Sequence, residues 1–260
     1  MGEQKNPIIQ VENFTAAFGD NVVIDNISFD VFEGERFIVL GGSGCGKSVL
    51  MKNMIGLYTP TEGRILIEGE DLHAVDEESR LEILKKIGVA YQSGALFGSM
   101  TVLENVMLPL EEFTDLTKDI REEIARMKIS LVGLSGSEKK LPSEISGGMK
   151  KRVAVARAMV LDPKILFFDE PGAGLDPITS VELDELILNL SDNLKITFVV
   201  VTHELMSIYK IANRVIMLDK RVKKIVAEGD PFDLRDNSDN PWVKQFFNRE
   251  SEKEIEKDVG

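Results

Sequence analysis

Two uninterrupted apolar runs dominate the hydrophobic pattern of the chain. They are Ile165-Leu166-Phe167-Phe168 and Thr197-Phe198-Val199-Val200-Val201, and a helical pattern around residues 178–190 lies between them. Strands without polar alternation are buried on both faces, which is typical of parallel strands joined by helices. A third run, Phe37-Ile38-Val39-Leu40, has the same character. The pattern therefore predicts an α/β fold around a mainly parallel sheet.

The first part of the chain alternates instead between apolar and polar residues. Short runs at 8–11, 22–24 and 27–31 are separated by the turn segments Gly19-Asp20-Asn21 and Glu33-Gly34-Glu35. This pattern predicts antiparallel strands and hairpins. Further short strands are expected at 64–69, 87–91, 215–218 and 225–227, and a helix at 77–86.

Helical periodicity replaces the strand pattern between residues 95 and 158. Ile120, Ile124, Met127 and Leu131 recur on one face of an amphipathic helix, and Gly133 follows as a stop. Because this block lies between two β-rich parts, we expect an inserted helical subdomain at about 95–158. The prediction is one domain over 1–244, with an N-terminal antiparallel β subdomain, and a charged C-terminal tail over 245–260, where residues 249–260 form a solvated or frayed helix.

The composition limits the partners and the cellular location that we expect for the chain. The chain has 260 residues and a formal charge of −13, which disfavours general binding to nucleic acid. Its single cysteine, Cys45, excludes an internal disulfide. No apolar run approaches 18 residues and the N-terminus lacks a signal-peptide core. We therefore expect a soluble chain that a partner holds at a membrane if it works there.

A glycine-rich loop supplies the first candidate chemistry. Residues Gly41-Gly42-Ser43-Gly44-Cys45-Gly46-Lys47-Ser48 have the spacing G-x-x-x-x-G-K-S, directly after an apolar strand and before a helix at Val49–Ile55. Loop amides and the helix N-terminus favour a polyphosphate; Lys47 is placed for the β- and γ-phosphates and Ser48 for Mg²⁺. A chance glycine turn is the weaker alternative. The loop alone leaves kinase, GTPase, motor and transporter ATPase open.

Four residues follow buried strands and are expected at one edge of the sheet. They are Gly41, Gln92, Asp169 and His203. Ligands of such sheets bind beyond the carboxyl ends of the strands. Asp169 can hold Mg²⁺ opposite Ser48, and Glu170 is a candidate general base for an attacking water. The structural alternative for an adjacent Asp-Glu pair is a helix N-cap.

A second anion-seeking helix start follows at Ser146-Gly147-Gly148. Two such helix starts cannot easily share one nucleotide within a monomer. A head-to-tail dimer lets the second site close on the ATP of the partner. The aromatic Phe18, on a loop before Gly19, is a candidate for stacking on a nucleotide base, with a place on the rim of the small sheet as the alternative.

The order of these motifs resembles the ATP-binding cassette (ABC) family over roughly residues 8–235. The correspondence comprises a Walker A loop (41–48), a Q-loop (Gln92), a signature (145–149), a Walker B strand (165–169) with the following Glu170, a D-loop (174–176) and an H-loop (His203). It implies a P-loop NTPase (RecA-like) core that hydrolyses ATP with Mg²⁺. Met149 departs from the usual Gln, and Gly172-Ala173-Gly174 departs from the usual Thr-Ser-Ala or Thr-Ser-Gly.

The resemblance also implies a role for each matching residue. Glu170, His203, Gln92 and Lys47 are implied in catalysis, and Ser48, Gln92 and Asp169 in binding Mg²⁺. The nucleotide is implied to contact Phe18, Gly41, Gly42, Ser43, Gly44, Cys45, Gly46, Lys47, Ser48 and Val49, together with Ser146, Gly147 and Gly148 of the opposite subunit of a homodimer.

Within the family, the segments 92–97, 101–106, 108–110 and 146–149 resemble the MlaF-type ATPases of the Mla and Mce lipid transporters of bacterial envelopes. That resemblance implies phospholipid transport, a membrane permease docking near residues 93–110, a small STAS-domain regulator and a substrate-binding Mce-domain protein. It also implies a cytoplasmic protein, peripheral on the inner membrane.

Three alternatives stay open from the sequence. The chain could power an importer for another small solute, be a soluble ABC ATPase of the iron–sulfur assembly type, or be a small-molecule kinase or GTPase, although no Asn-Lys-x-Asp guanine motif occurs. For the apolar residues Leu96, Phe97, Met100, Val102 and Leu103, the alternative to a docking groove is the core of the helical subdomain itself.

Overall fold

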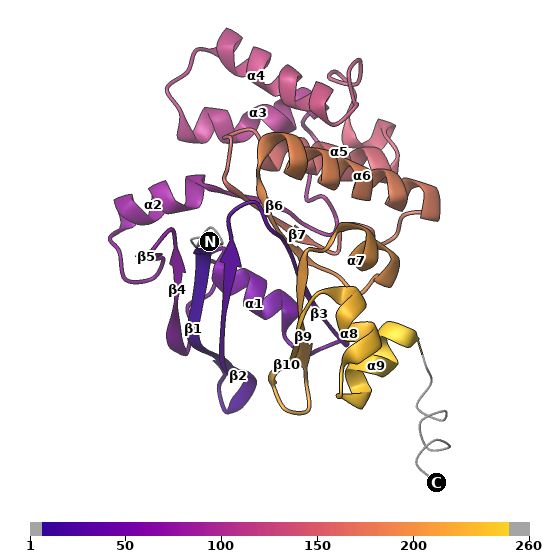
Figure 1. Cartoon of the computed structure of the whole chain (residues 1–260). Coiled ribbons are helices and arrows are strands. Elements are labelled where there is room, and N and C mark those ends of the chain that lie inside the picture. The colour runs from indigo at the N-terminus through magenta and orange to yellow at the C-terminus, as the bar shows by residue number, and fades with distance from the viewer. Residues whose placement is uncertain (1–6, 250–260) are drawn as a thin grey trace, which may run out of the picture.

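The structure is a computed structural model and describes residues 7–249 (Figure 1). Its larger sheet has the strand order β10-β9-β3-β8-β7-β6, in which β10 pairs antiparallel with β9 and the other neighbours pair parallel. The strands are β3 (Arg36–Gly41), β6 (Ile87–Ala90), β7 (Ile165–Asp169), β8 (Thr197–Val201), β9 (Arg214–Asp219) and β10 (Lys224–Gly229). The mainly parallel sheet predicted from the apolar runs is confirmed.

The smaller sheet is antiparallel, with the order β2-β1-β4-β5. Its strands are β1 (Pro7–Phe18), β2 (Asn21–Phe32), β4 (Glu62–Ile67) and β5 (Glu70–Asp71). The short runs expected at 22–24 and 27–31 are parts of one strand, β2, which forms a hairpin with β1 across Gly19 and Asp20. The register between them shifts several times, so bulges absorb the irregular alternation that the sequence shows.

The helices divide between the two faces of the larger sheet (Figure 1). Helices α1 (Lys47–Met54) and α2 (Glu77–Lys85) pack with the smaller sheet on one face. The other face carries α3 (Val102–Phe113), α4 (Lys118–Leu131), α5 (Gly147–Ala158), α6 (Pro177–Leu194), α7 (Leu205–Ile211), α8 (Pro231–Asn237) and α9 (Pro241–Asn248), with a short 3-10 turn η1 (Pro142–Glu144) before α5.

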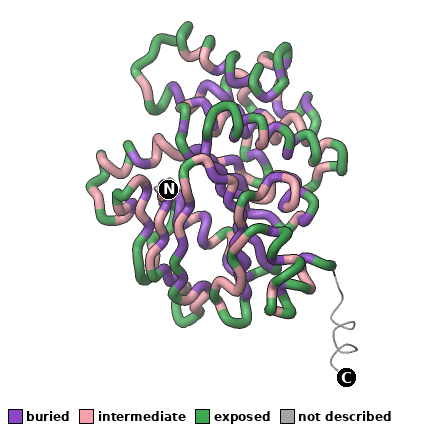
Figure 2. The backbone as a smooth tube through the Cα atoms, viewed as in Figure 1, coloured by how far each residue is buried: buried purple, intermediate pink, exposed green. Residues whose placement is uncertain are grey.

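Strand β3 shows why the apolar runs have no alternation. Phe37 and Val39 pack into the core beneath the smaller sheet, whereas Ile38 and Leu40 pack into the core beneath the helices, and all four are fully buried. Figure 2 shows the same pattern: buried residues run through the centre of the molecule and exposed residues gather on the outer segments. The strand ends are therefore held rigidly between two cores, which fixes the loops that follow them.

Helix α4 is present as predicted, but its large apolar residues do not face the core. Ile120, Met127 and Leu131 are 45%, 60% and 44% exposed, and only Ile124 of the predicted face packs against the core. The packed side carries Ala125, Lys128 and Ile129 instead. The small Ala125 allows close packing against the neighbouring helices α3 and α5, and the sequence pattern alone does not show which of two stripes is the packed one.

The C-terminal boundary also differs from the expectation. Helix α9 runs through Asn248, and its Val243 and Phe247 are buried in the core beneath the helices. The folded part therefore extends beyond residue 244. The charged stretch 250–260 lies outside the described residues. No helix within residues 7–249 is both long and apolar enough to span a bilayer.

Helix α6 buries one carboxyl group against α7. Asp184 is 5% exposed, and the Ser207 hydroxyl donates a hydrogen bond of 2.9 Å to its Oδ2. Burial raises the pKa of Asp184 from 3.8 to about 6. Ionisation is thus easier in the unfolded chain, so this carboxyl lowers the stability of the folded state as the pH rises from about 4 through about 6.

Replacing Asp184 by Asn should therefore stabilise the protein at neutral pH. The amide oxygen can still accept the Ser207 hydrogen bond, and the charge penalty, on the order of 1–3 kcal/mol, disappears. Thermal unfolding of both proteins between pH 4 and pH 8 checks this: the advantage of D184N should be largest above pH 6 and shrink toward pH 4. An advantage independent of pH, or a less stable variant at pH 7.5, would contradict it.

Candidate functional site

The loop between β3 and α1 requires its glycines. Gly41 has a φ of 147°, and a Cβ there would lie 2.4 Å from the Leu218 carbonyl oxygen. Gly46 caps α1 with a φ of 103°, and a Cβ would lie 2.8 Å from the Ile24 side chain. Both positions are accessible to glycine alone without strain. Gly42, Ser43 and Gly44 between them are exposed, with open space above both glycines.

Lys47 folds back over this phosphate loop (residues 41–48). Its Nζ donates hydrogen bonds to the carbonyl oxygens of Gly41 at 2.8 Å and Gly42 at 3.3 Å. A hollow of about 190 Å³ lies beside it, lined by Val23 and by residues 44–49. An ammonium group, an exposed hydroxyl at Ser48 and a helix N-terminus converge there, which fits a polyphosphate with a hard cation.

Cys45 has another environment within the same loop. It is 2% exposed and belongs to the core beneath the smaller sheet. Burial raises the pKa of its thiol, the opposite of what a reactive thiolate needs. The side chain therefore fills space beneath the loop.

The ends of β7 and β8 bring an acid pair and a histidine together. Glu170 follows β7, His203 follows β8, and His203 Nδ1 lies 2.8 Å from Glu170 Oε1. Burial, reinforced by the charge of Glu170, raises the pKa of Asp169, while Lys52, Lys47 and Lys151 counter that rise. The alternative of a helix N-cap does not apply to this pair, because α6 is capped by Asp176.

The backbone of Glu170 is unusual for a residue with a side chain. Its φ of 47° lies in the left-handed region. Its N–H donates to Val201 O at 2.8 Å, and its carbonyl accepts from Ala173 N–H at 3.1 Å. Strained conformations of this kind concentrate at functional sites and persist only where the surroundings hold them.

Gly172, shortly after Glu170, lies close to an acidic side chain. A Cβ on Gly172 would lie 2.2 Å from Glu204 Oε2 and 2.9 Å from Ser180 Oγ, so the acidic side chain occupies the space that a larger residue needs. A larger residue at this position would have to displace the Glu204 side chain, which contacts Ser180 of α6.

Gln92 lies just after β6 and is exposed at the same edge of the sheet. The segment that follows it is held by Arg157 of α5, whose guanidinium donates to Gly94 O and Ala95 O, each at 2.8 Å. Arg157 therefore links the helical subdomain to the Gln92 loop. The sequence placed Arg157 on a helix but gave no signal for this contact.

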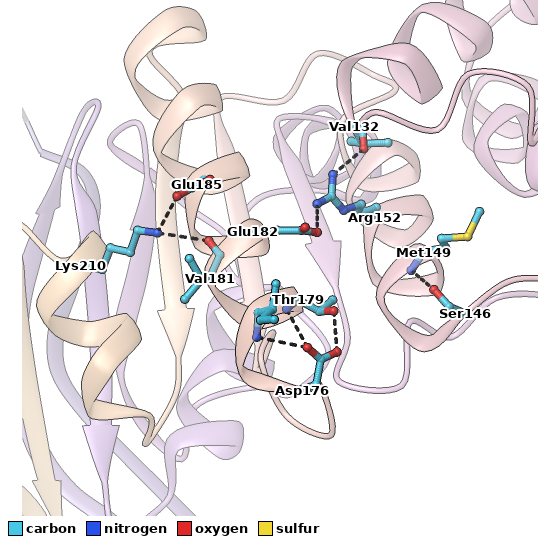
Figure 3. Close-up of polar contacts among 11 residues, drawn as sticks. Val132, Ser146, Met149, Arg152, Asp176, Thr179, Val181, Glu182, Glu185 and Lys210 are labelled. Atoms are coloured by element: carbon cyan, nitrogen blue, oxygen red, sulfur yellow. Dashed lines mark hydrogen bonds and ion pairs between the residues drawn. The ribbon is translucent and has the colours of Figure 1, made fainter.

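Ser146 begins α5 as predicted. The residue is exposed, and its Oγ accepts a hydrogen bond of 3.2 Å from Met149 N–H, which caps the helix (Figure 3). Met149 itself packs against the core beneath the helices. Among residues 7–249, no hydrogen bond joins the phosphate loop to the signature (residues 145–149).

Phe18 lies at the end of β1 and is 53% exposed. Its ring makes an edge contact with Tyr58, with 5.8 Å between the centroids. The structure thus brings residues 41–48, Gln92, Asp169, Glu170 and His203 to one edge of the larger sheet. Phe18 and Ser146 of the signature each have exposed surface.

A family model described as ABC transporter matches residues 24–173. The intermembrane phospholipid transport system ATP-binding protein MlaF of Haemophilus influenzae is 37% identical over 245 residues, which cover 94% of this chain and 92% of that protein. The probable ribonucleotide transport ATP-binding protein mkl of Mycobacterium leprae is 41% identical over 92% of this chain but 68% of that protein.

A solved structure gives the same result for the fold. The dimeric post-hydrolysis state of the ATP-binding cassette MJ0796, bound to ADP and Pi, has a TM-score of 0.76 and 29% identity, and the match covers 85% of this chain and 98% of that one. The similarity therefore covers nearly the whole of that cassette.

Proposed function

Because the chain belongs to the ABC transporter family, we propose that it is the ATP-hydrolysing subunit of a transporter that moves phospholipid in a bacterial cell envelope. ATP hydrolysis coupled to transport is the activity of the family. The observation that carries the choice of cargo is the nearly end-to-end similarity to a phospholipid transport ATPase. The mycobacterial relatives match over a smaller share of their length.

The residues at the edge of the sheet suit the two tasks of ATP hydrolysis, which are binding the phosphates with Mg²⁺ and activating the attacking water. The phosphate loop and Lys47 bind the phosphates, and Ser48, Asp169 and Gln92 are the oxygen donors for Mg²⁺. When bound, Mg²⁺ neutralises phosphate charge. Glu170 accepts a proton from the attacking water, and the 2.8 Å contact with His203 fixes the orientation of its carboxylate. Phe18 offers an exposed ring to the base.

Two copies complete the site in this proposal. The signature presents an exposed helix N-terminus that makes no hydrogen bond to the phosphate loop of its own chain within the described residues. An anion is the natural ligand of such a helix start. The similar cassette MJ0796 forms a dimer with bound ADP and Pi. In a homodimer in which each signature faces the ATP of the other subunit, both the phosphate loop and the signature of every chain contact a nucleotide.

A membrane permease is the next partner that the proposal requires. Phe97, in the loop before α3, is 51% exposed, whereas Val102 is fully buried, so the apolar segment divides between surface and core. Buried Asn105 orders this loop: its Oδ1 accepts from Phe97 N–H at 2.8 Å, and its Nδ2 donates to the carbonyls of Phe97, Met100 and Thr101.

A hollow of about 250 Å³ lies between α2 and the C-terminal half of α3. It is lined by Leu81 and Leu84 of α2, by Pro109 and Phe113 of α3, and by Arg157 of α5 among others. A short helix of a permease suits such a groove. Because Arg157 also holds the loop after Gln92, occupancy of the groove can act on that loop.

Replacing Phe97 by Glu should leave the fold and the basal ATPase rate unchanged but reduce copurification of the permease at least about tenfold, because the charge must be buried in the contact. Val222→Glu is the matched control, since Val222 is 53% exposed in the turn between β9 and β10. Equal recovery of permease with both variants would place the docking surface elsewhere.

The proposal places the subunit on the cytoplasmic face of the inner membrane, with a STAS-domain regulator and a Mce-domain protein as further partners. The second candidate cargo is a ribonucleotide, because the mycobacterial relative is described as a probable ribonucleotide transport protein. Affinity purification from native membranes, followed by mass spectrometry of bound proteins and lipids, distinguishes the two. Phospholipid retained with a permease supports the proposal, and a permease free of lipid that retains nucleotides contradicts it.

A further inference from the structure

Lys151 reaches the loop of Glu170 from the signature helix. It lies five residues after Ser146 on α5, and its Nζ donates a hydrogen bond of 3.2 Å to the Glu170 carbonyl oxygen. The side chain is half-buried. Burial lowers the pKa of Lys151, while the carboxylates of Asp169, Glu170 and Glu204 counter that change. The ammonium thus sits opposite a cluster of acids at the catalytic edge.

The contact bears on the strained backbone of Glu170. That residue is held in the left-handed region by its N–H bond to Val201 and by the Ala173 N–H bond to its carbonyl. Lys151 adds a charged donor to the same carbonyl, and hydrogen bonds to charged groups are stronger than neutral ones. Without Lys151, the Ala173 N–H still donates to this carbonyl, but the peptide after Glu170 and the carboxylate on the same residue are held less firmly.

The neighbouring residue shows that α5 is anchored independently of Lys151. Arg152 donates to Val132 O at 3.2 Å and pairs with Glu182 of α6 at 2.9 Å (Figure 3). Gly148 of the signature also lies close to α6, since a Cβ there would be 2.4 Å from Thr179 Cγ2. Loss of Lys151 therefore leaves these contacts of α5 with its neighbours intact.

We propose that Lys151 is a positioning residue that couples the signature helix of one subunit to the catalytic glutamate of that same subunit. This inference rests on the proposed function, because the signature is taken to face the ATP of the partner. Engagement of Ser146 by that ATP moves the start of α5, and Lys151 transmits the movement to Glu170 five residues further along the helix. Each site thereby responds to the nucleotide bound at the other.

Heterodimers distinguish this role from a general disturbance of α5. In each, one chain carries Glu170→Gln, so only the other chain hydrolyses its ATP, and single-turnover hydrolysis is measured. We expect Lys151→Met on the chain with intact Glu170 to slow hydrolysis at least about tenfold, with ATP affinity within about twofold. The same substitution on the Glu170→Gln chain, whose signature faces the active ATP, should change the rate by less than about twofold.

Two further variants complete the kinetic test. Lys151→Arg keeps a charged donor and should restore most of the rate, and Lys150→Met is the control for losing a lysine from the same helix. Lys151→Gln replaces Lys151→Met if the latter does not fold. An equal loss from both placements of the Lys151 variant, or a loss of ATP affinity that matches the loss of rate, would overturn the coupling role.

Hydrogen exchange tests the contact without any ATPase activity. The Ala173 amide, which donates to the Glu170 carbonyl, should exchange at least about tenfold faster in Lys151→Met than in Lys150→Met. Unchanged exchange at Ala173 would overturn the inference even if the enzyme is an active dimer. Conversely, if Ala173 exchanges faster in Lys151→Met but the wild-type protein hydrolyses no ATP, the proposed function is refuted while the positioning contact stands.

Discussion

A Glu170→Gln variant is expected to bind ATP normally and to lose ATP turnover by about 10²–10⁴-fold. The amide keeps the size of the side chain and the contact with His203 but cannot accept a proton from water. With hydrolysis blocked, ATP remains bound and the dimer stays closed. The variant should therefore elute as a dimer when ATP is present.

Steady-state hydrolysis, equilibrium binding of labelled ATP and size-exclusion chromatography measure these three properties. Glu185→Gln is the matched control, since Glu185 is an exposed acid on α6 that pairs with Lys210 (Figure 3). Glu170 is not the general base if its Gln variant hydrolyses ATP within a few fold of the wild-type rate.

Mixing two inactive variants should restore activity. Lys47→Ala removes the phosphate contact and Ser146→Arg blocks the signature, so neither homodimer has a working site. In random mixing half of the dimers are heterodimers, and each of these has one intact site of two, which predicts about a quarter of the wild-type rate per chain. The physical reason is that each proposed site combines Lys47 of one subunit with Ser146 of the other.

The measurement is the ATPase rate of each variant alone and of the equimolar mixture after subunit exchange. A control mixture of Lys47→Ala with a Lys47→Ala/Ser146→Arg double variant should stay inactive, because no intact phosphate loop is present. A mixture no more active than its components would contradict the composite site, as would full activity per chain in dilute monomeric protein.

The catalytic edge could be predicted because its causes are local. A strand such as β7 is apolar throughout, so it is buried on both faces, and parallel strands place Asp169, Gln92 and His203 at the same edge. The glycines of the phosphate loop could be predicted from their spacing, although the lack of room for a Cβ at Gly41 comes from the distant Leu218 carbonyl.

The contacts between the helices and that edge could not be predicted. Lys151 and Arg157 have long side chains on a helix whose path over the sheet is set by distant packing, and neither sequence position indicates a partner. The same limit applies to α4, where two stripes compete and the one with Ala125 packs inward. The C-terminal end of the folded part could not be predicted either, because it depends on the burial of Phe247 of α9 against distant residues.

The most direct test of the account is ATP-driven phospholipid movement by the complex purified with this subunit. The complex is placed in vesicles with a fluorescent phospholipid, and transfer to acceptor vesicles is followed before and after ATP is added. The account predicts transfer that needs ATP and that disappears with Glu170→Gln. Transfer that is the same without ATP, or ATP hydrolysis that moves a water-soluble nucleotide and no phospholipid, would contradict it.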